Sequence, residues 1–133
     1  MRENATIKLQ SREASYTVRA EARREGGALL LRYLEPAELG LAGVATELEL
    51  CEGCAVIRRS GAVKSELRFE EGVPHTSLYE TAHGSFTAEL TTHALRARLG
   101  SRGGLVELRY TLCLGGAEDE HRMKILIRTE EEI

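Results

Sequence analysis

The sequence predicts an all-β protein, a closed antiparallel up-and-down barrel of about eight to ten strands. Apolar and polar residues alternate over many short runs, which is the period of strands with one buried face. Short, glycine-containing connections separate these runs and suit β-hairpins. A meander of that many strands with one apolar face must stack as a sandwich or close on itself, and closure removes the exposed edges.

Length and composition bound the class of protein. The chain has 133 residues, which predicts a single domain over residues 1–133, because a chain of this size buries about two thirds of its unfolded surface. Apolar residues make up 42% and charged residues 29%, as in soluble globular proteins. The net charge of −3 gives no general attraction to nucleic acid or to an anionic membrane.

A cytoplasmic location is expected. The amino terminus lacks the apolar run of a secretory signal, and no segment approaches the ~20 apolar residues of a membrane span. Three cysteines, an odd number, fit a reducing compartment better than a disulfide framework.

The first third of the chain reads as strands with one irregular segment. An alternating run over residues 6–10 continues in extended fashion over 16–23, which predicts one strand or a bent pair. After the turn signal Gly26-Gly27, the run 28–34 is apolar on both parities, so its outer side is expected to meet something. Segment 35–43 allows a helical turn, because it has a proline near its start and two glycines near its end.

The central stretch, residues 55–72, organises the predicted barrel. The half-buried strand pattern of 44–51 precedes it, and a two-residue Glu52-Gly53 turn would pair Cys51 with Cys54. Directly opposed residues share a face, so the register predicts that Arg59 points inward. A three-residue loop, Ser60-Gly61-Ala62, would then return the chain with Val63, Ser65, Leu67 and Phe69 on the inward face.

A second predicted hairpin joins residues 76–82 to 86–92 through a His83-Gly84 turn. The expected facing pairs are Thr81 with Phe86, Tyr79 with Ala88 and Ser77 with Leu90.

The last predicted strands follow a change of parity. Between Thr92 and Leu95 the apolar positions switch faces, which predicts a bulge or bend. The run 106–114 has the cleanest alternation in the chain, and 123–127 forms the last strand before an acidic tail.

A set of spaced residues carries a resemblance to a known family. They are Arg59-x-Gly61-Ala62-Val63-Lys64, Phe69-x-x-Gly72 and Tyr79-x-Thr81-x-x-Gly84, with Tyr33-x-Glu35 before them and Tyr110 after. With these motifs the chain resembles the YwiB-like family of small bacterial proteins, which is similar in architecture to the calycins, the lipocalin-like barrels. The resemblance implies a calycin-like barrel, and it implies no reaction, because the family has no established biochemical role. At Cys51 and Cys54 the chain departs from the family pattern, so no shared metal role is implied there.

Cys51 and Cys54 have the spacing of half a zinc knuckle. A structural zinc site needs four ligands, and neither Cys113 nor the four histidines supply a second pair at ligand spacing. We therefore treat the two cysteines as weak metal candidates on an ordinary hairpin turn and the histidines as residues of turns or outward faces. No metal or cofactor is expected.

The sequence gives no reason to expect an enzyme. No nucleophile is brought to a base by the strand pattern, and no glycine-rich loop precedes a helix to cradle a phosphate. Basic residues gather on two outer faces, Arg58, Lys64 and Arg68 on the central hairpin and Arg96, Arg98, Arg102 and Arg109 on the later one. Glu66 and Glu107 interrupt them and no aromatic residue is interleaved, which favours charge pairing on a solvated surface over nucleic-acid binding.

The sharpest hypothesis concerns polar residues that the alternation sends toward the barrel axis. They are Arg59, Tyr33, Tyr79, Tyr110, Ser65, Thr81 and Thr92. A buried guanidinium needs a partner, and Glu35 shares the parity of Tyr33, so we expect Glu35 to pair with Arg59.

Two interpretations of this interior remain open. The set forms a structural ion pair that plugs the barrel, which we favour slightly, or it anchors a small anionic or carbonyl-bearing ligand. A third class, a protein-interaction or self-association module such as a homodimer, would use outward apolar residues. These are Leu30, Leu34, Leu78 and Leu126.

Overall fold

The computed structural model describes residues 3–12, 14–36 and 43–131, and their regular structure is ten β-strands in one antiparallel sheet. The strands are β1 (Glu3–Ser11), β2 (Ser15–Glu25), β3 (Ala28–Leu34), β4 (Val44–Cys51), β5 (Cys54–Gly61), β6 (Ser65–Phe69), β7 (Pro74–Thr81), β8 (Gly84–Gly100), β9 (Gly103–Leu114) and β10 (Ala117–Glu131). The helical turn expected in segment 35–43 falls mostly on residues 37–42, outside the described residues. Among the described residues, no helix is long and apolar enough to cross a membrane.

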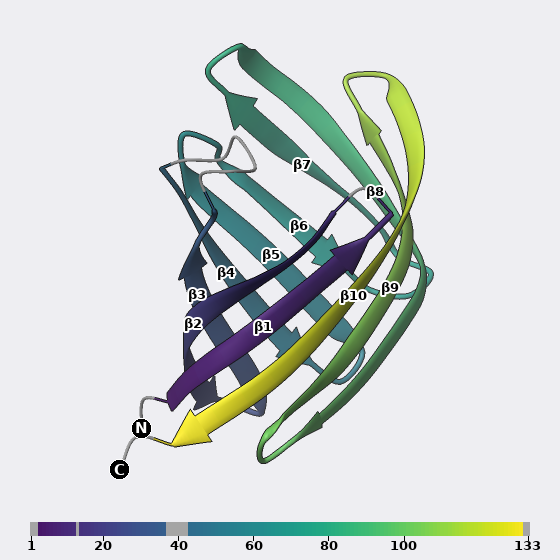
Figure 1. The fold of residues 1–133 in the computed structure, drawn as a ribbon. Helices are drawn as coiled ribbons and strands as arrows, with labels where there is room; N and C mark the ends of the chain where they lie inside the picture. The colour runs from purple at the N-terminus through teal and green to yellow at the C-terminus, as the bar shows by residue number, and fades with distance from the viewer. Residues whose placement is uncertain (1–2, 13, 37–42, 132–133) are drawn as a thin grey trace.

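The sheet curls into a nearly closed barrel, as Figure 1 shows, which confirms the predicted fold. Strands adjacent in sequence pair throughout except β6 and β7, and β1 pairs with β10, so the first and last strands lie side by side. The edges β6 and β7 meet through one antiparallel bridge between Lys64 and Glu80, whose two N–H···O distances are both 2.9 Å. Beyond the other end of β6, Gly72 N donates to Thr92 O at 3.0 Å. Between these two hydrogen-bonded contacts β6 and β7 are not paired, and the barrel wall is open there.

In the central stretch, the register between β4 and β5 is the predicted one. Cys51 lies opposite Cys54, and Thr46 opposite Arg59. The loop after Arg59 was placed two residues too early, because β5 continues to Gly61 and Arg59 faces Ser65. Gly61 has φ 100°, and a Cβ there would lie 2.1 Å from Gly43 O, so only glycine fits this approach.

The register of the β7–β8 hairpin also differs from the predicted one. Tyr79 faces Phe86 and Thr81 faces Gly84, which makes Ala82-His83 the turn and moves the pairing by two residues. Thr81 Oγ1 donates to Gly84 O at 3.2 Å and accepts from His83 N at 3.1 Å, which favours this tighter turn. A shift of two keeps every side chain on its predicted face. The register change between Thr92 and Ala94 confirms the predicted bulge.

Alternate side chains from all ten strands point to the barrel axis, and most of them are apolar and buried. Phe69 is fully buried and meets Tyr110 edge to face, with ring centroids 4.9 Å apart. His121 lies opposite Tyr110 and stacks on its ring at 5.2 Å. The prediction that all four histidines sit at turns or on outward faces is therefore wrong for His75, which lies in β7 opposite the buried Leu90, and for His121. The parity of β10, continued back from Met123, gives the physical reason for His121, since it places this side chain on the inner face.

Candidate ligand-binding groove

A row of polar side chains crosses four neighbouring strands on the inner face. The registers place Tyr33, Thr46, Arg59 and Ser65 directly opposite one another on β3, β4, β5 and β6. Residues opposed across strands lie on the same face, so this row follows from the pairing alone. It ends at the parted wall between β6 and β7.

Glu35 lies behind this row, one residue beyond β3, with its side chain fully buried. Thr46 Oγ1 donates to Glu35 Oε1 at 2.7 Å, and the Tyr16 hydroxyl donates to Glu35 Oε2 at 3.3 Å. Arg59 Nε lies 3.9 Å from Glu35 Oε1, so the expected pair is present. A buried carboxylate is tolerated when a cation and hydrogen bonds compensate it, and here both do.

The same environment acts on two tyrosines. Burial raises the pKa of Tyr33 well above its ordinary value of 10.0, and the nearby charges of Tyr16 and Glu35 add to the rise. Burial, followed by the charge of Glu35, also raises the pKa of Tyr16. Both phenols therefore stay neutral hydrogen-bonding groups around the carboxylate at physiological pH.

Where the wall is open, a groove of about 800 Å³ lies between strands β3–β6 and strand β7, lined by outward residues together with the inward Arg59 and Ser65. We call it the β6–β7 groove. Its lining is mainly polar and carries more cationic than anionic side chains: Arg32, Ala45, Glu47, Arg58, Arg59, Ser60, Lys64, Ser65, Glu66, Arg68, His75, Thr76, Ser77, Leu78 and Glu80.

Three buried polar atoms of this lining have no hydrogen-bond partner among the described residues: Arg59 Nε, Ser65 Oγ and His75 Nε2. Ser65 is 9% exposed. Arg59 Nε has only the ion pair with Glu35, and His75 Nε2 lies 3.5 Å from Glu70 Oε1 without hydrogen-bond geometry. Buried polar groups are normally satisfied, so three in one groove indicate room for a polar group from outside the chain.

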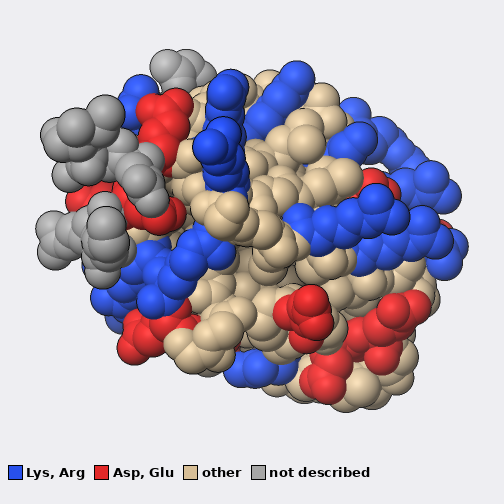
Figure 2. All heavy atoms as spheres, turned by 90° about the horizontal axis from the view of Figure 1, so that it is seen from below, with Lys and Arg blue, Asp and Glu red and all other residues tan. Residues whose placement is uncertain are grey.

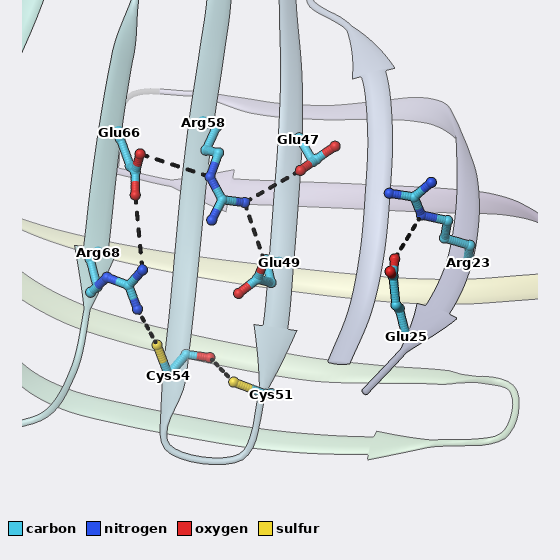
Figure 3. A network of polar contacts seen from close by, with 9 residues as sticks. All are labelled: Arg23, Glu25, Glu47, Glu49, Cys51, Cys54, Arg58, Glu66 and Arg68. Atoms are coloured by element: carbon cyan, nitrogen blue, oxygen red, sulfur yellow. Dashed lines mark hydrogen bonds and ion pairs between the residues drawn. The ribbon is translucent and has the colours of Figure 1, made fainter. Parts of the chain in front are cut away.

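On the outer side of the groove the charges neutralise one another (Figure 3). Arg58 Nη1 lies 3.3 Å from both Glu47 Oε1 and Glu49 Oε1, and Arg58 Nε lies 3.9 Å from Glu66 Oε2. Arg68 Nη2 lies 3.9 Å from Glu66 Oε1. These side chains are partly exposed, so the pairs add little stability, but they hold the guanidinium groups in place.

The two candidate metal-ligating cysteines flank the hairpin turn beside that network (Figure 3). The Cys51 thiol donates to Cys54 O at 3.2 Å, and Arg68 Nη1 donates to Cys54 Sγ at 3.6 Å. Burial, and then the nearby Cys54 thiol, raises the pKa of Cys51. Within residues 3–12, 14–36 and 43–131, no three or more histidine, cysteine, aspartate or glutamate side chains gather as metal ligands.

The structure brings together part of the predicted site. Arg59, Glu35 and Tyr33 form one cluster, of which Arg59 alone lines the β6–β7 groove. The other predicted residues have structural contacts instead. Tyr79 is half-buried against the core, the Thr81 hydroxyl makes hydrogen bonds within its own turn, and Tyr110 packs between the rings of Phe69 and His121.

Three contributing residues were not predicted, namely Tyr16, Thr46 and His75. Thr46 was within reach of the sequence, because the register that sets Leu48 opposite Ile57 also sets Thr46 opposite Arg59. Tyr16 and His75 come from strands distant in the chain. Alternation puts Tyr16 on the inner face with Val18, and His75 with Ser77, but no local pattern shows which residues they meet.

The outward apolar residues take varied positions. Leu34 is 75% and Leu78 53% exposed, Leu126 is 37% exposed, and Leu30 is half-buried. Leu78 lines the β6–β7 groove and gives it an apolar contact.

These features define a nearly closed antiparallel β-barrel with a polar groove in its wall. The chain belongs to the family described as a domain of unknown function, DUF1934, whose pattern matches residues 2–125. It is similar to the uncharacterized beta-barrel protein YwiB of Bacillus subtilis (strain 168), with 30% identity over 100 residues, covering 75% of this chain and 68% of that protein. The crystal structure of that YwiB protein superposes with a TM-score of 0.70 at 20% identity, over 99% of this chain and 91% of the other. The family resemblance and the fold are thus confirmed.

Proposed function

We propose that this protein is a non-catalytic, calycin-like binding barrel that takes a small anionic or carbonyl-bearing molecule in the β6–β7 groove against Arg59. The observation that carries the proposal is the convergence of three unsatisfied buried polar atoms, on Arg59, Ser65 and His75, along one groove. An acceptor oxygen placed there would receive hydrogen bonds that the chain itself does not supply.

The charge of the groove supports an anionic or carbonyl ligand. Arg59, held against Glu35, can turn its remaining N–H groups toward the opening, since its side chain is 20% exposed. Lys64 and Arg32 line the same space, and no ion pair neutralises either side chain among the described residues. The volume of about 800 Å³ lies within the ~300–1,000 Å³ of small-molecule sites.

Native mass spectrometry of the protein purified from the cells that naturally make it tests the proposal. We expect a retained anionic or carbonyl-bearing small molecule on the wild-type protein and its loss from Ser65→Ala. Thermal unfolding with added citrate and with inorganic phosphate gives a second readout, in which the ligand raises Tm by mass action.

Ser65→Ala separates binding from folding. If Ser65 Oγ has no partner in the free protein, removing it should leave Tm unchanged or raise it, while binding weakens about 10-fold. Ser85→Ala is the matched control, because Ser85 is exposed on β8 outside the groove. A wild-type protein that carries no small molecule and gains no Tm from either anion would refute the proposal, and so would equal binding by the two variants.

A further inference from the structure

A second groove, of about 590 Å³, lies over β8, β9, β10 and the end of β1 with the turn after it. Among the described residues, its charged side chains are all exposed and one of them is acidic: Arg12, Arg96, Arg109, Arg122, Lys124 and Glu107. We call the five cations the basic face. Figure 2 shows that lysine and arginine side chains gather over some parts of the surface and acidic ones over others, despite the small net charge of −3.

The sheet register forces these cations together. Arg109 lies directly opposite Arg122, and Glu107 lies between Arg96 and Lys124 on the two neighbouring strands. Like charges opposed across strands are destabilising, so the Arg109–Arg122 pair does not help the fold. A polyanion bound across them would remove this repulsion.

The basic face lacks the neutralisation seen elsewhere. Arg58, on the wall by the first groove, has three carboxylates within 4 Å, at 3.3, 3.3 and 3.9 Å. No ion pair or side-chain hydrogen bond involves the five cations of the basic face within the described part of the chain. The sequence-based expectation of charge pairing therefore holds for Arg58 and Arg68 on the central hairpin and fails for Lys64 and for the basic face, where Glu107 is the one described acidic residue among five cations.

We propose that the basic face binds the phosphate backbone of a nucleic acid, without regard to base sequence. Guanidinium groups match phosphate oxygens in bidentate geometry. Successive outward side chains on one strand, such as Arg122 and Lys124, are ~6.6 Å apart, and neighbouring strands are ~4.8 Å apart, which spreads the cations as a strip. The lining contains no aromatic side chain, so base stacking contributes nothing.

Shape and charge density favour nucleic acid over the other polyanions. A flat membrane surface cannot enter a groove, and none of the apolar lining residues, Ala94, Leu108 and Met123, is exposed for insertion. Double-stranded nucleic acid carries a denser line of charge than an acidic protein segment, so releasing its condensed counterions gives the larger gain.

Fluorescence anisotropy with a labelled double-stranded DNA of about 20 base pairs tests the inference. With about four phosphate contacts, the affinity should fall roughly 100-fold between 50 and 200 mM salt. Arg109→Ala and Arg122→Ala should each lower the salt slope by about 1 and weaken binding to different sequences equally.

Arg109→Glu and Arg23→Glu form a matched pair, because each changes the net charge by the same amount. Arg23 is exposed on β2, outside the basic groove, and is paired with Glu25 at 3.5 Å. We expect Arg109→Glu to weaken binding at least 10-fold more than Arg23→Glu. Equal losses, absence of binding at 50 mM salt, or binding to phosphatidylserine vesicles without binding to the DNA would overturn the inference. None of these outcomes depends on the β6–β7 groove.

Discussion

Replacing Arg59 with alanine should destabilise the barrel by about 3–5 kcal/mol, because the buried Glu35 carboxylate would lose its cation. The two charges are 3.9 Å apart, and at an effective dielectric constant of ~20 their attraction is about 4 kcal/mol. The Glu35 side chain is fully buried, so water cannot replace the lost guanidinium. Against a total stability of about 5–15 kcal/mol, this loss is large.

A double-mutant cycle separates the lost pair from the uncompensated charge. Glu35→Gln removes the charge and keeps a carbonyl oxygen that can accept the hydrogen bond from Thr46. In the Arg59→Ala background, Glu35→Gln should therefore recover most of the lost stability.

Urea unfolding followed by far-ultraviolet circular dichroism measures the four proteins of this cycle. A loss of less than about 1 kcal/mol in Arg59→Ala would show that Glu35 does not depend on Arg59. The reasoning would also be wrong if the double variant were no more stable than Arg59→Ala, since then no buried charge was left uncompensated.

Three further predictions follow from the buried groups. The pKa of Tyr33 is raised above 10.0 chiefly by burial, so the unfolded chain releases this proton at a lower pH than the folded protein does. The free energy of unfolding should therefore keep its full value below about pH 10 and decline above it, and the decline should be less steep in Tyr33→Phe. Urea midpoints measured from about pH 8 to 11 test this prediction. Gly103→Ala should lower Tm by several degrees or prevent folding, because φ is +117° and a Cβ would lie 2.1 Å from Ile127 O; an unchanged Tm would contradict the β9–β10 approach. Phe69→Ala should lose about 3–5 kcal/mol in urea unfolding, because the ring is fully buried, and a loss under ~1 kcal/mol would mean that the core refills the space.

The polar cluster shows how far local patterns reach. Alternation predicted that Arg59 points inward and that Glu35 is its partner, and the two lie together because short hairpins carry the parity from strand to strand. The loop after Arg59 was misplaced by two residues, since glycine-rich turns allow more than one closure. Tyr16 joins Glu35 from β2, a contact that no spacing in the sequence encodes.

The amino-acid sequence by itself determined the strands, their inner faces and the barrel class, because a side-chain period of two and a turn are properties of neighbouring residues. The tertiary structure decided where the barrel fails to close, which buried atoms have no partner in the parted wall, and which arginines meet opposite one another without a carboxylate. Those outcomes depend on how edges far apart in the chain come together, and alternation within a strand says nothing about that.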